Sequence, residues 1–209
     1  MGALFKIGGY DFVNLKYLRN LKGRTSTYKK IAKKYKKIGD TKSDVFTFVA
    51  QANSAFMKIL MVCLGNICRS PLAEGILKAK IEKKGLDWQV DSAGTGSWHV
   101  GELPDPRSIA IARQYGIDIT YQRARQFKAD DLQSFDLIFA MDTQNYRDML
   151  RLAKDETERA KIQLIMHMVQ PDSNQSVPDP YWDDDGFELV FRMLDEACEE
   201  IMLRFEAAL

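Results

Sequence analysis

The chain has 209 residues, of which 45% are hydrophobic and 28% are charged, so it can build a sizeable core and is not a wholly disordered protein. Its three cysteines are too few, and odd in number, for a disulfide scaffold, and they favour a reducing, cytoplasmic compartment. No apolar stretch reaches the roughly 18–20 residues that cross a membrane, and polar residues interrupt the N-terminus where a signal peptide needs an apolar run.

The first 56 residues differ in charge from the rest. They hold 12 basic and 3 acidic residues, a net charge of +9, whereas residues 57–209 hold 18 basic and 26 acidic residues, a net charge of −8. Apolar residues at helical spacing over 27–38, with lysines on the other faces, predict a helix that can lie on anionic lipid or nucleic acid. The alternatives are a solvated, disordered tail and a gene-model extension upstream of a true start at Met57. We therefore divide the chain into a basic N-terminal extension, 1–56, and a domain, 57–209.

From Met57 onward, short apolar runs alternate with helical periods. Strands are predicted at 58–63, 88–90, 136–141 and 161–166, and helices at 70–84, 105–116, 143–154 and 186–208, with loops at 91–101 and 170–186. This alternation predicts right-handed βαβ units and an α/β fold with a doubly wound sheet of about four parallel strands flanked by helices. In such folds ligands bind at the carboxyl ends of the strands, where the strand order reverses.

The turn after the first strand has the residues of a phosphate-binding loop. Its sequence is Cys63, Leu64, Gly65, Asn66, Ile67, Cys68, Arg69, Ser70, Pro71. A tight turn into a helix start aims backbone N–H groups into one concavity. Gly65 can take backbone angles closed to other residues, and Asn66, the next most tolerant residue type, can brace the loop through its side chain.

The side chains of this loop suit phosphoryl transfer. Arg69 offers a planar fork that matches two phosphate oxygens. A sulfur at the centre of these donors is stabilised as thiolate, so we expect Cys63 to be the nucleophile and Ser70 to donate its hydroxyl to it. A single cysteine at the end of a strand is more often a buried packing residue. The whole set of loop residues, at the point where the strand order reverses, favours the catalytic interpretation.

Six blocks of this sequence resemble those of the low-molecular-weight protein tyrosine phosphatases. They are VCLGNICRSPLAEG (62–75), DSAGTGSWHVG (91–101), PDPRS (104–108), RARQF (123–127), MDTQNYRDM (141–149) and VPDPYW (177–182). The resemblance covers roughly residues 57–209 and leaves out 1–56. It implies a flavodoxin-like fold and hydrolysis of phosphotyrosine or small aryl phosphates through a cysteinyl phosphate, with no metal and no cofactor.

The resemblance also assigns an acid and a substrate rim. Asp179 matches the general acid and base of the family, although Asp-Pro also starts turns. Trp98, Tyr181 and Trp182 lie on the two loops expected to rim the pocket, where aromatic walls stack on phosphotyrosine and exclude the shorter phosphoserine. The alternative for each aromatic residue is a place in the core, and Tyr181 suits either. The acidic run 183–185 is interpreted as a solvated rim, not a metal site.

Five further residues are interpreted, Cys68 and Gln122 from the resemblance and the others from the residue pattern. In relatives, a cysteine such as Cys68 forms a reversible disulfide with the nucleophile, and the alternative is a small packing residue. Cys198 is expected in the core. Gln122 stands where the family often has a histidine, and it cannot titrate near neutrality. The two histidines, His99 and His167, receive no chemical role because no cysteine or carboxylate lies at ligand spacing.

Three other functions compete with phosphotyrosine hydrolysis. An arginine phosphatase of this scaffold typically has threonine where this chain has Ile67. An arsenate reductase needs a further cysteine pair, and only Cys198 remains. A binding adaptor would act on nucleic acid or an anionic membrane through 1–56. The expected partners of the lead hypothesis are a phosphotyrosine protein, a small aryl phosphate, and phosphate or another oxyanion in the loop.

Overall fold

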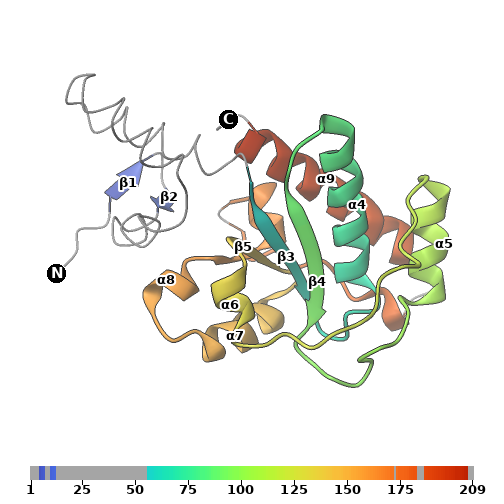
Figure 1. The fold of residues 1–209 in the computed structure, drawn as a ribbon, viewed down its shortest axis with the longest axis horizontal. Helices are drawn as coiled ribbons and strands as arrows, with labels where there is room; N and C mark the ends of the chain where they lie inside the picture. Colours follow the sequence, from blue (N-terminus) through green and yellow to red (C-terminus); the bar gives the residue numbers. More distant parts are fainter. Residues whose placement is uncertain (1–4, 8–9, 13–55, 172, 183–185, 207–209) are drawn as a thin grey trace.

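The computed structural model describes residues 5–7, 10–12, 56–171, 173–182 and 186–206 (Figure 1). The strands β1 (Phe5–Ile7) and β2 (Tyr10–Phe12) pair antiparallel, a hairpin that the sequence pattern did not predict. The predicted helix over 27–38 lies outside the described residues. Within the part of the chain that the structure describes, no helix is long and apolar enough to span a membrane.

A parallel sheet of four strands organises residues 57–209. Its strands are β3 (Lys58–Cys63), β4 (Gln89–Gly94), β5 (Leu137–Ala140) and β6 (Ile162–Leu164), in the order β4-β3-β5-β6. This confirms the predicted four-stranded α/β fold. Because β4 lies on one side of β3 and β5 on the other, the strand order reverses at the carboxyl end of β3, where Cys63 pairs with Gly94.

Helices cover both faces of the sheet (Figure 1). α4 (Arg69–Lys84), α5 (Pro106–Gln114) and α9 (Gly186–Glu206) pack together on one face. α6 (Asp131–Ser134) and α7 (Thr143–Leu152) cover the other, and α8 (Glu156–Arg159) follows α7. α4 ends where the sequence predicted, because Gly85 takes the left-handed conformation (φ +67°) that closes a helix.

The residues of β3 alternate between two apolar clusters. Ile59 and Met61 pack among the side chains of α4 and α9, whereas Leu60 and Val62 pack against those of α6 and α7. All four are fully buried. Burial on both faces explains why the sequence of this strand is a continuous apolar run.

Two predicted strand boundaries are wrong. β4 continues through Gly94, so residues 91–94 are strand and not the start of a loop. Gly94 has little β propensity, but its position needs glycine, since a Cβ there would lie 2.8 Å from the carbonyl oxygen of Leu64. At the other edge, β6 stops at Leu164, and the next four residues form a short 3-10 helix, η2 (Ile165–Met168).

Candidate active site

Cys63 is the last residue of β3, and its sulfur has two hydrogen-bonding neighbours. The Oγ of Ser70 lies 3.0 Å from Cys63 Sγ, and the backbone N–H of Asn66 donates to the same sulfur at 3.2 Å. Cys63 is buried. The loop therefore closes over the sulfur as the sequence predicted, with Ser70 beside it.

Asn66, and not Gly65, takes the unusual backbone conformation of this loop. Among the described residues Asn66 is the single non-glycine with a positive φ, +56°, whereas Gly65 is absent from the residues with positive φ. The left-handed residue of the loop is therefore Asn66 and not the glycine beside it. Asparagine tolerates the left-handed region because its short side chain can bond locally. The position of Gly65 favours glycine for another reason: the His99 ring lies so near that a Cβ on residue 65 would be 3.0 Å from it.

The side chain of Asn66 joins three segments. Its Nδ2 donates to Ser70 Oγ and to Ser92 Oγ, each at 2.9 Å, and its Oδ1 accepts the backbone N–H of Arg125 at 2.8 Å. Ser92 is a residue of β4, and the sequence analysis missed it. These bonds fix the orientation of the Asn66 amide and with it the hydroxyl of Ser70.

The same network reaches a buried carboxyl group. Ser92 Oγ donates to Glu74 Oε2 at 2.6 Å. Burial raises the pKa of Glu74 to about 7, against the lowering effect of that hydrogen bond. Gln122 Nε2 donates to the carbonyl oxygen of Pro71 at 3.2 Å, while its Oε1 is buried with no hydrogen-bond partner among the described residues.

Arg69, the first residue of α4, is held by three oxygens. Its Nη1 donates to Asp142 Oδ2 at 2.7 Å and to the carbonyl of Val177 at 3.1 Å, and its Nη2 donates to Asp179 Oδ2 at 3.2 Å. Burial alone would lower the pKa of Arg69, but the charges of Cys63 and Asp179 and the bond to Asp142 raise it. The guanidinium therefore remains a fixed positive charge next to Cys63.

Asp142 is a site residue that the sequence analysis did not identify. It follows β5 and caps α7, because its Oδ1 accepts the backbone N–H of Asn145 at 2.7 Å. The available signal was its place at the carboxyl end of a predicted strand. One carboxylate thus starts a helix and orients Arg69.

The structure brings Asp179 next to Arg69 although 110 positions separate them in the sequence. Asp179 precedes the short 3-10 helix η3 (Pro180–Trp182), and its Oδ1 accepts the backbone N–H of Tyr181 at 3.3 Å. Cys63, Arg69 and Asp179 therefore lie at the same edge of the sheet, as predicted.

The three aromatic residues expected at the rim lie at this edge, Trp98 on the loop after β4 and Tyr181 and Trp182 in η3. Trp98 is 71% exposed, Trp182 is 88% exposed and Tyr181 is 39% exposed. The loop of Trp98 lies against the phosphate loop, since the N–H of Gly96 donates to the carbonyl of Leu64 at 2.8 Å. Within the phosphate loop, Leu64 is exposed and Ile67 is buried. The acidic run 183–185 lies outside the described residues.

All three cysteines are free and buried. Burial, with the nearby charge of Asp105, raises the pKa of the Cys68 thiol to about 12. Cys198 lies in the core under α4, and burial raises the pKa of its thiol as well. The disulfide between Cys63 and Cys68 stays a prediction.

Neither histidine takes part in a cluster of metal-ligating groups. His99 Nδ1 bonds Glu102 Oε2 at 2.7 Å, and His167 lies in η2. Among the described residues, no group of three or more histidine, cysteine or acidic side chains could hold a metal ion.

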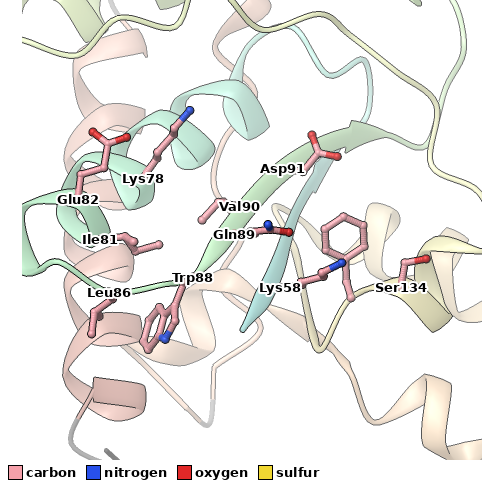
Figure 2. Close-up of a pocket in the computed structure, with 11 residues that line it drawn as sticks. Lys58, Lys78, Ile81, Glu82, Leu86, Trp88, Gln89, Val90, Asp91 and Ser134 are labelled. Atoms are coloured by element: carbon pink, nitrogen blue, oxygen red, sulfur yellow. The ribbon is translucent and has the colours of Figure 1, made fainter. Parts of the chain in front are cut away.

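A hollow of about 430 Å³ lies at the other end of the sheet from the candidate site (Figure 2). Lys58 and Gln89, the first residues of β3 and β4, line it together with Trp88 and residues of α4. None of the residues predicted for the site lies there.

Comparisons with known proteins agree with this geometry. Residues 58–209 match the family model described as low molecular weight phosphotyrosine protein phosphatase. The chain is 44% identical over 135 residues to the protein of that name from Schizosaccharomyces pombe. The aligned residues make up 63% of this chain and 85% of that relative.

Two solved structures illustrate the fold likeness. YfkJ from Bacillus subtilis has a TM-score of 0.67 at 38% identity and covers 73% of this chain and 96% of its own. DARP, described as a Drosophila arginine phosphatase, has a TM-score of 0.67 at 37% identity, and the match covers 71% of this chain and 98% of DARP.

Proposed function

Because this chain belongs to the low molecular weight phosphotyrosine protein phosphatase family, we propose that it hydrolyses phosphotyrosine through a covalent phosphate on Cys63. The observation that carries this proposal is the contact of Arg69 with Asp179, together with the electrostatic interaction of the same guanidinium with the sulfur of Cys63. It supports roles as nucleophile, fixed cation and acid for Cys63, Arg69 and Asp179, at the edge of the sheet where the strand order reverses.

In the first step the Cys63 thiolate attacks phosphorus in line with the bond to the phenolic oxygen. The S–P bond forms as the P–O bond breaks, and Asp179 donates its proton to the departing oxygen. The Arg69 guanidinium and the loop amides stabilise the charge on the equatorial oxygens. Ser70, which lies 3.0 Å from the sulfur, stabilises the thiolate before attack and again when it leaves.

In the second step Asp179, now a carboxylate, takes a proton from water. The resulting hydroxide attacks the phosphocysteine, the S–P bond breaks, and inorganic phosphate leaves with the thiolate restored. Asp179 therefore acts as acid and then as base, and the proton that it gives to the phenolate is replaced by one taken from water.

The exposed aromatic side chains support a preference for aryl phosphates. Trp98 and Trp182 offer large apolar faces at the edge that carries the site, and such faces stack on a phenyl ring. We assign them, with Tyr181, to substrate binding. Phosphotyrosine is preferred over phosphoarginine in this proposal because Ile67, not threonine, stands in the loop.

The test compares variants of the full chain on phosphotyrosine peptide and on p-nitrophenyl phosphate. Cys63→Ser should abolish turnover and still bind inorganic phosphate, because Arg69 and the loop amides remain. Cys198→Ala is the matched control, since it removes a thiol from the core and not from the site. Turnover that survives Cys63→Ser would exclude the proposed nucleophile, and a larger kcat/KM on phosphoarginine would exclude the proposed substrate.

We also propose that the catalytic domain is 57–209 and that 1–56 is a separate basic extension. The change of net charge from +9 to −8 at this boundary supports the division, as does a family match that begins at Lys58. A cytoplasmic location is supported by three free thiols, which suit a reducing compartment.

A further inference from the structure

Arg107, in the first turn of α5, contacts the loop of Asp179 on one side and an anchor of the phosphate loop on the other. We propose that Arg107 is a positioning residue that holds Asp179 where it can protonate the leaving group. The inference rests on the proposed function, since it concerns the acid step of that reaction.

Asp105 fixes the direction of the Arg107 side chain. Its Oδ1 accepts the Nε of Arg107 at 3.1 Å and its Oδ2 accepts Nη2 at 3.0 Å, while Oδ1 also caps α5 through the Arg107 backbone N–H at 2.8 Å. Asp105 is buried. A guanidinium held at two nitrogens by one carboxylate has a single orientation.

The same Asp105 is tied to the phosphate loop. Its backbone N–H donates to the carbonyl oxygen of Ile67 at 2.8 Å, and the next turn adds a contact at 3.4 Å from Ser108 Oγ to the carbonyl of Cys68. The position of the Arg107 fork is therefore set relative to Cys63 and Arg69 and not only to its own helix.

From this anchor Arg107 reaches the segment that carries the acid. Its Nη2 donates to the carbonyl oxygen of Tyr181 at 3.1 Å, and the Tyr181 N–H donates to Asp179 Oδ1 at 3.3 Å. Its guanidinium carbon lies 5.7 Å from the centre of the Tyr181 ring and 4.7 Å from that of Phe187, in the first turn of α9. Arg107 thus holds the chain at a residue just after Asp179 and again where α9 begins.

A lysine cannot replace these contacts. The carboxylate of Asp105, the carbonyl of Tyr181 and the Phe187 ring lie around one planar group, and an ammonium is a point charge without a flat face. Without the guanidinium, Asp179 keeps its bond from Arg69 and that from the Tyr181 N–H, but η3 loses its link to α5, and the distance from Asp179 to the leaving oxygen becomes variable. A misplacement of about 1 Å in a reacting group can cost about a hundredfold in rate.

The test measures kcat/KM for full-length Arg107→Lys and Arg107→Gln on aryl phosphates whose leaving groups range from p-nitrophenol to phenol. We expect a loss of about tenfold to a hundredfold on phenyl phosphate and less than about threefold on p-nitrophenyl phosphate, because a good leaving group needs little protonation. Inhibition by inorganic phosphate should change by less than about twofold, in line with an intact phosphate loop.

A double variant separates positioning from a general structural role. Arg107→Lys added to Asp179→Asn should cause no further loss on phenyl phosphate, because the proton donor is already gone. Arg113→Gln is the matched control, since it removes a charge from an exposed position of the same helix. It should leave the leaving-group dependence unchanged.

Three results would overturn the inference. The first is an equal loss of kcat/KM on every leaving group together with weaker inhibition by phosphate. The second is a loss of kcat/KM in the double variant that is the product of the losses in Arg107→Lys and Asp179→Asn. The third is full activity of both Arg107 variants on phenyl phosphate. The proposed acid role of Asp179 is refuted by a different result, namely an equal loss of kcat/KM on good and poor leaving groups in the single variant Asp179→Asn.

Discussion

The buried carboxyl of Glu74 makes the stability of this protein depend on pH in an unusual direction. Its burial raises the pKa from 4.5 in the unfolded chain to about 7 in the folded state, so the folded state binds the proton more tightly. As pH rises from about 4.5 to 7 the unfolded chain loses this proton first, and the contribution of Glu74 to the free energy of unfolding falls. Above about pH 7 both states are ionised and the loss is complete.

The size of this effect follows from the two pKa values. Each unit of difference corresponds to about 1.4 kcal/mol, and the part of the shift that develops between pH 5.5 and 8.5 lowers the free energy of unfolding by about 2 kcal/mol. The charges that face Glu74 come from Asp91, which raises its pKa, and from Lys78 and Arg125, which lower it. The shift therefore includes their effects.

Glu74→Gln removes the titration and keeps an oxygen that can accept the hydroxyl of Ser92. We expect urea unfolding at pH 5.5 and 8.5 to show that the free energy of unfolding falls by about 2 kcal/mol more in the wild type than in the variant. Glu82→Gln, an exposed change on the same helix, is the control and should follow the wild type. Equal pH dependence of wild type and Glu74→Gln would refute the reasoning.

Three further predictions concern the site and the extension. Asp142→Asn removes the carboxylate charge that pairs with Arg69. It should weaken inhibition by phosphate and lower kcat/KM about equally for good and poor leaving groups, and a loss of kcat/KM confined to poor leaving groups would contradict this. Iodoacetate at pH 7.5 should modify Cys63, with protection by phosphate, and leave Cys68 unmodified, because burial raises the pKa of Cys68 to about 12; mass spectrometry of the peptides decides, and label on Cys68 speaks against the assignment. Deletion of 1–56 should reduce retention on heparin, since that segment carries a net charge of +9; equal retention of the deleted and full-length proteins discards a role for it on anionic surfaces.

The parts of the site that the sequence could predict are those set by local chain geometry. β3, the loop after it and the start of α4 are continuous in the sequence, so an apolar run followed by glycine, asparagine and arginine was enough to place Cys63, Arg69 and Ser70. Asp179 was placed by the resemblance of its block to a known family.

The parts that it could not predict depend on contacts between distant segments. Ser92, Asp142 and Arg107 act through partners 26, 73 and 74 positions away. No local pattern distinguishes Ser92 from an ordinary strand serine or Arg107 from a surface arginine, and the place of Asp142 after a predicted strand suits a helix cap equally well. The extent of β4 was missed for the same reason, because residues with low β propensity are held there by the loop that packs on Gly94.

The special backbone angle shows a finer limit. Glycine is the residue expected at positive φ, and the loop offers both Gly65 and Asn66. The three side-chain bonds of Asn66 decide between them, since an asparagine in the left-handed conformation can bond Ser70, Ser92 and Arg125 together and a glycine cannot.

The central claim is that the sulfur of Cys63 carries the phosphoryl group during turnover. Asp179→Asn, mixed with p-nitrophenyl phosphate, forms the covalent phosphate through a good leaving group and lacks the base that hydrolyses it. Rapid quenching followed by peptide mass spectrometry should find one phosphate, on Cys63, within the first turnover. A phosphate on another residue, or p-nitrophenol released in the first turnover with no phosphorylated protein formed, would contradict the account.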